Sequence, residues 1–459
     1  MRKIVFIVFL MLSVGYAQNN EVLYDFAELP QTLILNPGAE VSNNFYVGFP
    51  LLSQVAVQGG FSAFSYYDIF ASNGVDINTK IDDAVQKFGN AEFIEVNQKL
   101  EALSGGFKLN NTIYLSFGYY QEFNSLIKIP KSLVDLAYYG NSDINHNYSV
   151  NKLAARAELL GVFHAGISKK INEKWQVGAR GKIYSSAINV SSKRNAGALK
   201  TTYGTDNIYK QQLNNVDLLM QTSGVFLEDE DGNIDVEAAD FVKKMLLGGN
   251  LGLGLDLGFT HNYKEQWTVS GSVLDLGFVY NTQNVKSYQV KGDFEVEGFD
   301  LEFDNSNAAD YWNDLKDRFE KEVVLDTLYT KYITLRPLKF YGAIHYSFGK
   351  EYDNCRFETR PGLFSNKVGV QLYSTLGQVH SNLALTLFFE HWFNKHFQAK
   401  VTYTADSYTF ANLGLGISTQ LGPVNLYLLA DNLQYLSNLY AAKSANVQVG
   451  LNFIFYNNN

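Results

Sequence analysis

The chain has 459 residues, of which 46% are hydrophobic, 15% aromatic and only 18% charged, and its formal net charge is −9. Ordinary soluble proteins carry about a quarter charged residues, so the composition fits them poorly. The acidic balance argues against a nucleic-acid partner, because no basic stripe is present to neutralise phosphates. The single cysteine, Cys355, excludes an internal disulfide and is read as a plain loop residue, since no histidine or asparagine constellation surrounds it.

Residues 1–17 have the form of a secretory signal peptide. Arg2 and Lys3 precede the apolar run "IVFIVFLMLSV", and the small-residue pattern at 15–17 marks a cleavage site. The run of about 11 apolar residues is shorter than the roughly 20 that a membrane-spanning helix needs. The mature chain is therefore expected to begin near Gln18 and to be exported.

Beyond residue 50, apolar and polar residues alternate in segments of about ten, joined in pairs by short polar turns such as 169–174, "HNYKEQ" and "HWFNKH". Odd positions at 153–167 and 175–183 are apolar or small, whereas even positions carry the charged residues. In the next hairpin, Leu251 to Phe259 alternate with glycines and Asp256. Because successive side chains of a strand face opposite sides, each hairpin has one apolar and one polar face.

Two architectures produce this alternation: a soluble sandwich or barrel with a dry interior, and a membrane barrel with lipid outside and a polar lumen. Three observations favour lipid. The apolar faces are longer than a sandwich needs, the chain carries an export signal, and aromatic residues cluster at strand ends, where a girdle would lie: Trp175, Trp267, Phe397 and Phe453.

The pattern predicts an all-β fold, a transmembrane antiparallel β-barrel of about fourteen strands with short helices in its long loops. The predicted strands are 54–66, 94–108, 112–124, 152–170, 174–190, 248–262, 266–280, 336–349, 366–375, 380–391, 396–404, 409–420, 423–430 and 446–456. Short turns fall on one rim and long loops on the other, which is the outer-membrane pattern with the short turns periplasmic. The connection at 350–365 breaks this rule. Residues 18–50 are assigned to a periplasmic or plug segment, and 51–459 to the barrel.

Two long loops contain further signals. Asp229, Asp231, Asn233 and Asp235 alternate as in a calcium loop, but the glycine stands at the fourth position instead of the sixth, so a solvated acidic turn before a short helix at 236–247 is the preferred interpretation. The stretch "NAADYWNDLKDRFEKEVV" has helical spacing. Its apolar residues Tyr311, Leu315 and Phe319 are expected to pack on the barrel rim.

No enzyme, metal centre or cofactor is predicted. The seven histidines are scattered, and no nucleophile motif or phosphate loop stands in its required context. The charged residues on the even faces are predicted to point into the lumen, where they either pair with one another or with a plug, or form a selective constriction. These lumen-facing candidates are Arg156, Glu158, His164, Arg180, Lys182, Asp256, Glu390 and Lys400.

Alternation persists almost to the last residue, with apolar side chains at 447, 449, 451, 453 and 455. A chain end normally frays and becomes polar. We therefore expect the last strand to close against the first, so that no strand edge faces lipid. Such a terminal strand is also similar to the signal that outer-membrane barrel assembly machinery recognises.

The segment "LPQTLILNPGAEVSNNFYVGFPLLSQV", which contains Asn36-Pro37-Gly38, and the elements "INEKWQVGARGKIY", "SVLDLGFVYN" and "LADNLQ" resemble an uncharacterised family of Bacteroidota outer-membrane β-barrels that carries one domain of unknown function. That family is in turn similar to the FadL-type and PorV-type fourteen-stranded barrels. The resemblance implies fold and cell outer membrane, and the family has no settled activity to carry over.

The leading functional hypothesis is therefore a porin-like or FadL-like channel or transporter for small or hydrophobic molecules, with residues 18–50 as plug. The alternative is a non-transporting barrel that binds partner proteins or acts as an accessory to type IX secretion. Outer-membrane lipid and the assembly machinery are expected partners in both cases. A hydrophobic ligand would distinguish the first hypothesis, and a secretion-system partner the second.

Overall fold

The computed structural model describes residues 20–26, 29–205, 208–224, 237–297, 308–352, 363–394, 396–435 and 437–456. The predicted signal peptide, Cys355 and most of the connection at 350–365 lie outside these residues. So do all four candidate calcium ligands, Asp229, Asp231, Asn233 and Asp235.

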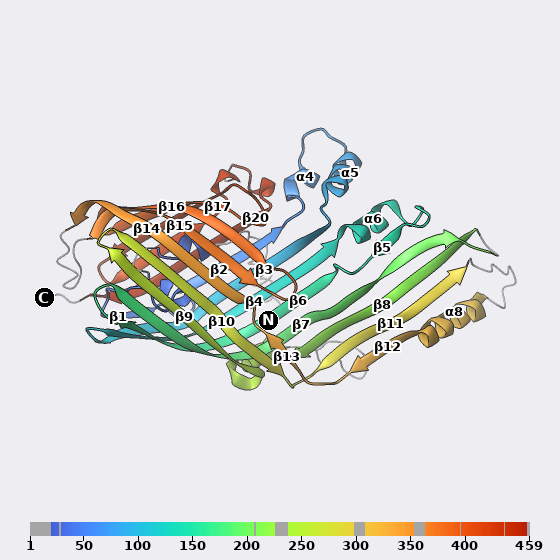
Figure 1. The fold of residues 1–459 in the computed structure, drawn as a ribbon, viewed down its shortest axis with the longest axis horizontal. Coiled ribbons are helices and arrows are strands. Elements are labelled where there is room, and N and C mark those ends of the chain that lie inside the picture. Colours follow the sequence, from blue (N-terminus) through green and yellow to red (C-terminus); the bar gives the residue numbers. More distant parts are fainter. Residues whose placement is uncertain are drawn as a thin grey trace.

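Fourteen antiparallel strands close into a barrel (Figure 1). Each of the predicted strands overlaps one of them, so the predicted fold is confirmed. In order around the ring they are β1 (Phe45–Gly48) with β2 (Gln54–Phe61), β3 (Ala91–Asn110), β4 (Ile113–Pro130), β6 (Ala154–Lys170), β7 (Trp175–Tyr203), β9 (Asn250–Lys264), β10 (Trp267–Asn281), β13 (Tyr332–Leu335) with β14 (Leu338–Tyr352), β15 (Leu363–Leu376), β16 (Asn382–Asn394), β17 (Phe397–Ala405), β18 (Asn412–Leu421), β19 (Val424–Ala430) and β20 (Ser444–Phe455).

The ring closes between the last strand and the first. β20 pairs with β1, where Phe45 lies opposite Phe455, and with β2, where Val57 lies opposite Val447. The first barrel strand is therefore built from two short pieces, and β1 falls within the range 18–50 that the sequence assigned to the N-terminal segment. The alternation at the chain end is explained, because both neighbours of β20 are barrel strands.

The outer face of the barrel is apolar and the inner face polar. Leu253 on β9 is 59% exposed and Leu385 on β16 is 50% exposed, whereas Asp256 and Lys400 are fully buried. This distribution is the reverse of that in a water-soluble barrel, whose apolar residues are inside. Among the described residues, no helix has the length and apolarity to cross a membrane.

The two rims differ in their connections. The short-turn rim carries tight turns such as those between β3 and β4 and between β9 and β10. The long-loop rim carries α4 (Tyr66–Phe70), α5 (Ile77–Lys87), α6 (Lys131–Tyr139) and β5 (Asn147–Ser149), which stand beyond the barrel in Figure 1.

A sheet also extends past the long-loop rim, where the sequence analysis predicted loops. β7 continues beyond the barrel and pairs with β8 (Tyr209–Gly224), followed by β11 (Lys286–Glu297) and β12 (Val323–Leu328) (Figure 1). The stretch "NNVDLLMQ" of β8 does not alternate cleanly, and this strand was missed. β11 alternates, with Tyr288, Val290 and Phe294 on one face, and was missed nevertheless.

The two predicted loop helices are present. α8 (Ala308–Glu322) contains the predicted apolar spacing, and α7 (Ala238–Lys243) with η1 (Lys244–Gly248) falls at the predicted 236–247. The expected packing of α8 on the barrel rim is wrong for Phe319, whose ring lies 5.0 Å from that of Phe294 on β11. The helix covers the extended sheet because that sheet supplies the nearest apolar surface.

Candidate functional site

The N-terminal segment lies inside the barrel. Residues 20–26 and 29–43, called the plug below, contain α2 (Asn20–Leu23) and α3 (Thr32–Leu35). Val22, Leu23 and Phe26 are completely buried, together with Tyr24, which is 1% exposed. The ring of Tyr24 stacks on Tyr341 of β14 at 5.0 Å. Together with wall residues such as Tyr373 and Leu429, these plug residues form an apolar core inside the barrel.

The turn at Asn36-Pro37-Gly38 rests on glycines of the barrel wall. A Cβ atom on Gly178 of β7 would overlap the carbonyl of Pro37, and one on Gly258 of β9 would overlap the side chain of Asn36. The Asn36 side chain donates to the carbonyl of Phe259 at 3.1 Å and accepts from the Gly38 backbone at 2.9 Å. Glycine is required at these wall positions because plug and strand backbones touch there.

Polar contacts fix the plug to several walls. Gln31 donates to Glu101 of β3 at 3.1 Å and to Asn452 of β20 at 2.8 Å. On the opposite side, Lys400 of β17 donates to the carbonyl of Tyr24 at 2.6 Å. These bonds satisfy buried groups on the wall and in the plug at once, and each would cost about 1–3 kcal/mol if left unmade.

Asp25 is the charged anchor of the plug. Its carboxylate lies 2.7 Å from His345 on β14 and 3.6 Å from Lys367 on β15. Burial alone would raise the pKa of Asp25, but Lys367 and His345 beside it hold the pKa well below its usual range. Asp25 is thus held as a carboxylate facing basic groups of the wall.

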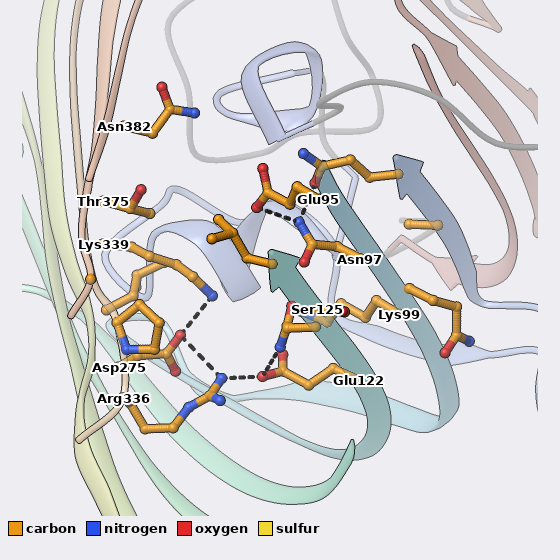
Figure 2. Close-up of a pocket in the computed structure, with 18 of the residues that line it drawn as sticks. Glu95, Asn97, Lys99, Glu122, Ser125, Asp275, Arg336, Lys339, Thr375 and Asn382 are labelled. Atoms are coloured by element: carbon orange, nitrogen blue, oxygen red, sulfur yellow. Dashed lines mark hydrogen bonds and ion pairs between the residues drawn. The ribbon is translucent and has the colours of Figure 1, made fainter. Parts of the chain in front are cut away.

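The plug divides the lumen into two chambers. The smaller chamber, of about 180 Å³, faces the long-loop rim and is lined by residues of β2, β3, β4, β14 and β20 (Figure 2). The larger chamber, of about 810 Å³, is lined by residues of the short-turn rim, including Asn110 and Lys174. The two chambers share no lining residue, and plug residues line both.

A network of buried ion pairs crosses the floor of the smaller chamber (Figure 2). Arg336 contacts the carboxylates of Glu122 on β4 and Glu158 on β6. Asp275 on β10 accepts from Lys182 at 2.7 Å and from Lys339 at 2.8 Å. Charges in a protein interior are usually paired, and the network joins five wall strands, β4, β6, β7, β10 and β14, to the link at Arg336.

All eight lumen-facing candidates from the sequence lie in the interior, each at most 8% exposed. Six belong to β6, β7 and β9. Arg156 pairs with Glu158 at 3.0 Å, Lys182 pairs with Asp256 at 2.8 Å, and the remaining two of these six are His164 and Arg180. The other two, Glu390 and Lys400, lie on β16 and β17 near the plug. The structure therefore brings together one group of six and one pair. All have an ionic or hydrogen-bonded partner except His164, whose ring nitrogens neither accept nor donate a hydrogen bond among the described residues.

Sequence reasoning missed Asp275 and Arg336. Asp275 stands at an odd position, so alternation assigns it to the outer face. A bulge between Val273 and Leu276 shifts the register, and Asp275 takes a left-handed backbone with φ of 61° that turns it inward. Arg336 is the first residue of the predicted strand 336–349, lies between β13 and β14 in the structure, and was not among the candidates. The one sequence signal for this site was that Asp275 interrupts the otherwise apolar set of odd positions in its strand.

Among the residues that the structure describes, no group of three or more histidine, cysteine, aspartate or glutamate side chains could hold a metal ion. The candidate calcium ligands at 229–235 lie in a stretch outside those residues, so the calcium hypothesis stays untested.

Fold and site together define a closed, plugged β-barrel with a charged lumen. Over residues 37–431 the chain matches DUF5723, a family of unknown function, and it belongs to that family. The match spans the plug turn at Pro37 and thirteen of the barrel strands. A comparison with curated proteins finds no match.

Three solved structures illustrate the structural likeness, each at 9% sequence identity. They are a FadL homologue from Pseudomonas aeruginosa (TM-score 0.44, covering 96% of this chain and 99% of that one), the Ralstonia pickettii toluene transporter TbuX (0.41, 96% and 96%) and the Pseudomonas putida toluene transporter TodX (0.39, 97% and 96%). TM-scores of this size assign neither a ligand nor a mechanism to this chain.

Proposed function

We propose that this protein is an outer-membrane channel for small molecules whose path is closed by its own N-terminal plug. Its placement in a membrane is supported by the outward apolar residues and by exposed aromatic residues near the short-turn rim, among them Trp175 and Trp267, each 40% exposed. Indole rings prefer the boundary between lipid and water. The signal peptide expected from the sequence supports export to the outer membrane.

One observation carries the channel proposal: a segment that takes no part in the ring of strands separates two chambers, one toward each rim. The ring is closed by β20 with β1 and β2, so the barrel does not depend on the plug for its hydrogen-bonded wall. The plug is held by contacts such as Gln31 with Asn452 and Asp25 with His345, all of which are non-covalent. Its displacement would join the chambers into one path.

The test replaces Gly178, one of the wall glycines that the plug turn contacts. Gly178→Leu places a side chain where the Pro37 carbonyl lies, so we expect the turn to be expelled and planar lipid bilayers containing this variant to conduct. Gly181→Leu is the matched control on the same strand, because a Cβ at Gly181 meets no atom within 4 Å. It should remain as closed as the unsubstituted protein.

Folding of both variants is checked by their heat-dependent mobility in gel electrophoresis. If the Gly178→Leu barrel is folded, its N-terminal segment becomes accessible to protease and its bilayers still do not conduct, the channel proposal is wrong.

The second candidate function is partner binding, including the secretion-accessory role. The extended sheet favours it: β12 pairs with β11 along one edge, no pairing along its other edge occurs among the described residues, and Leu325 is 55% exposed. Exposed strand edges are sites where another chain can add a strand. Cross-linking of intact cells followed by mass spectrometry tests this function. Loss of a cross-linked protein in Leu325→Lys, without loss of folded barrel, would favour it over the channel.

A further inference from the structure

Lys99 on β3 lies in the smaller chamber without a counter-charge. Its ammonium stands 4.0 Å from the centre of the Tyr120 ring, and among the described residues no carboxylate lies within ion-pair distance of it. The carboxylate directly across the ladder belongs to Glu122, but this side chain turns to Arg336 instead. Lys99 is thus the cation that the network leaves unpaired.

The neighbouring cations differ from Lys99 in this respect. Arg156 pairs with Glu158, Lys182 with Asp256 and Asp275, Lys339 with Asp275, and Arg336 with Glu122 and Glu158. Among the described lysines and arginines that line the chamber, every one except Lys99 therefore has at least one carboxylate within 4.0 Å. A cation in so enclosed a place is stabilised by an anion that reaches it.

The wall beside Lys99 forms a hollow. Strand register places Lys99, Ala56 and Gln448 in one row across β3, β2 and β20. The methyl group of Ala56 leaves space between two long polar side chains. The next row toward the long-loop rim consists of Asn97, Gln58 and Asn446, so carboxamides border the hollow on that side.

Two buried acceptors in this wall also lack partners. The side-chain oxygens of Gln54 and Asn446 accept no hydrogen bond from any described residue, although these side chains are only 2% and 3% exposed, and both line the chamber. A buried carbonyl without a donor is costly. The wall thus offers one cation and two free acceptors to whatever occupies the chamber.

We propose that the smaller chamber binds a small organic anion rich in hydroxyl groups, with its carboxylate on Lys99 and its hydroxyl groups donating to Gln54 and Asn446. The inference rests on the proposed channel function and names its substrate class. An ammonium on a flexible stem suits a carboxylate, and free carbonyl oxygens suit hydroxyl donors. The paired network below supplies a fixed floor and takes no part in binding.

Isothermal titration of the detergent-purified protein tests binding directly, with gluconate as probe and sorbitol as its uncharged counterpart. We expect gluconate to bind and sorbitol to bind much more weakly. Lys99→Met should weaken gluconate binding about tenfold or more, the loss expected for one hydrogen bond to a charged group, while Lys99→Arg retains most of it. Ala56→Leu should fill the hollow and weaken binding without removing a charge.

Lys264→Met is the control, because this exposed lysine lies on the opposite side of the plug, in the lining of the larger chamber. If Lys99→Met and Lys264→Met bind gluconate equally well, or if sorbitol binds as tightly as gluconate, the proposal is overturned.

Bilayer recordings separate this inference from the channel proposal. In the Gly178→Leu background, Lys99→Met should lower the preference for anions over cations, measured as the reversal potential in a salt gradient. An unchanged reversal potential in a conducting barrel contradicts the anion site and leaves the channel intact. Gluconate binding that depends on Lys99, in a barrel that never conducts, contradicts the channel and leaves the site.

Discussion

The two sides of the lumen differ in what neutralises their charges. On β4, β6, β7, β9 and β10, carboxylates and cations of the wall pair with one another, as Lys182 does with Asp275. On β14 to β17, the wall charges are completed in part by the plug, which brings Asp25 to His345 and the Tyr24 carbonyl to Lys400. The first side is a self-sufficient structural element. The second side binds the plug through charged groups, and we expect the loss of a charge to weaken docking of the plug most on that side.

The largest effect is expected from the self-sufficient side. Arg336→Met leaves the carboxylates of Glu122 and Glu158 buried beside a neutral side chain, which should lower the free energy of unfolding by about 3–5 kcal/mol. Guanidinium titration of the detergent-solubilised barrel measures this loss. The control Lys316→Met removes an exposed pair with Glu320 on α8 and should cost less than about 1 kcal/mol. Equal effects of the two substitutions would show that the network does not stabilise the barrel.

The second effect concerns the plug-dependent side. Asp25→Asn removes the charge that faces His345 and Lys367, so docking of the plug should weaken by about 1.5–3 kcal/mol, the value typical of a charged hydrogen bond. Unfolding of the barrel should hardly change. The measurement is the rate at which protease cleaves the N-terminal segment, with the exposed Asp83→Asn as control. If Asp25→Asn lowered the stability of the barrel and did not speed cleavage of the N-terminal segment, the two sides of the lumen would not differ in the way described.

The last effect, which is the smallest when taken per pH unit, is a dependence on pH. Glu21 of α2 is 2% exposed, and burial, with Asp406 and Glu95 nearby, raises its pKa to about 8. The docked plug therefore binds a proton that the released plug, with a pKa near 4.5, does not. The contribution of Glu21 to docking is largest below pH 4.5 and weakens as the pH rises toward 8, by at most about 1.4 kcal/mol per unit.

Protease accessibility of the plug should therefore increase between pH 5 and pH 8 and change little above. Asp406 and Asp431, whose pKa values burial also raises, act in the same direction. Glu21→Gln should reduce the slope and keep the plug docked at pH 8. A variant with the slope of the unsubstituted protein would show that Glu21 does not titrate in this range.

The two sides of the lumen also show how much of the barrel and of its charged interior the sequence alone can predict. All fourteen barrel strands follow from alternation, because a wall between lipid and a polar lumen must alternate. The alternation of odd and even positions also places Glu390 and Lys400 correctly in the lumen. Strands β16 to β20 pair with only one shift in register, between Trp392 and Asn394, so their two faces are not exchanged. Alternation fails at Asp275, where a bulge reverses the faces.

Contacts that join distant parts of the chain carry no local signal. The sequence around Asn36 and Gly178 does not indicate that the plug turn contacts this wall glycine. Lys99 likewise resembles many other alternating polar residues in the sequence, and only the structure shows that Glu122 pairs with Arg336 instead of with Lys99. Of the extended strands, β8 and β12 do not alternate strictly, whereas β11 alternates from Ser287 to Glu297 and was missed all the same. A strand without a lipid face need not alternate strictly.

The two-piece first strand limits how the plug can enter the barrel. The plug leads directly into β1, which forms one side of the seam with β20. Once β20 has paired with β1 and β2, a hydrogen-bonded wall surrounds the lumen on all sides. The plug must then already lie in the lumen or enter it through an open rim. We therefore expect the short ladders of β1 and β2 with β20 to form last during assembly. Backbone amide hydrogens in these ladders should exchange with solvent before those of the long β3–β4 hairpin.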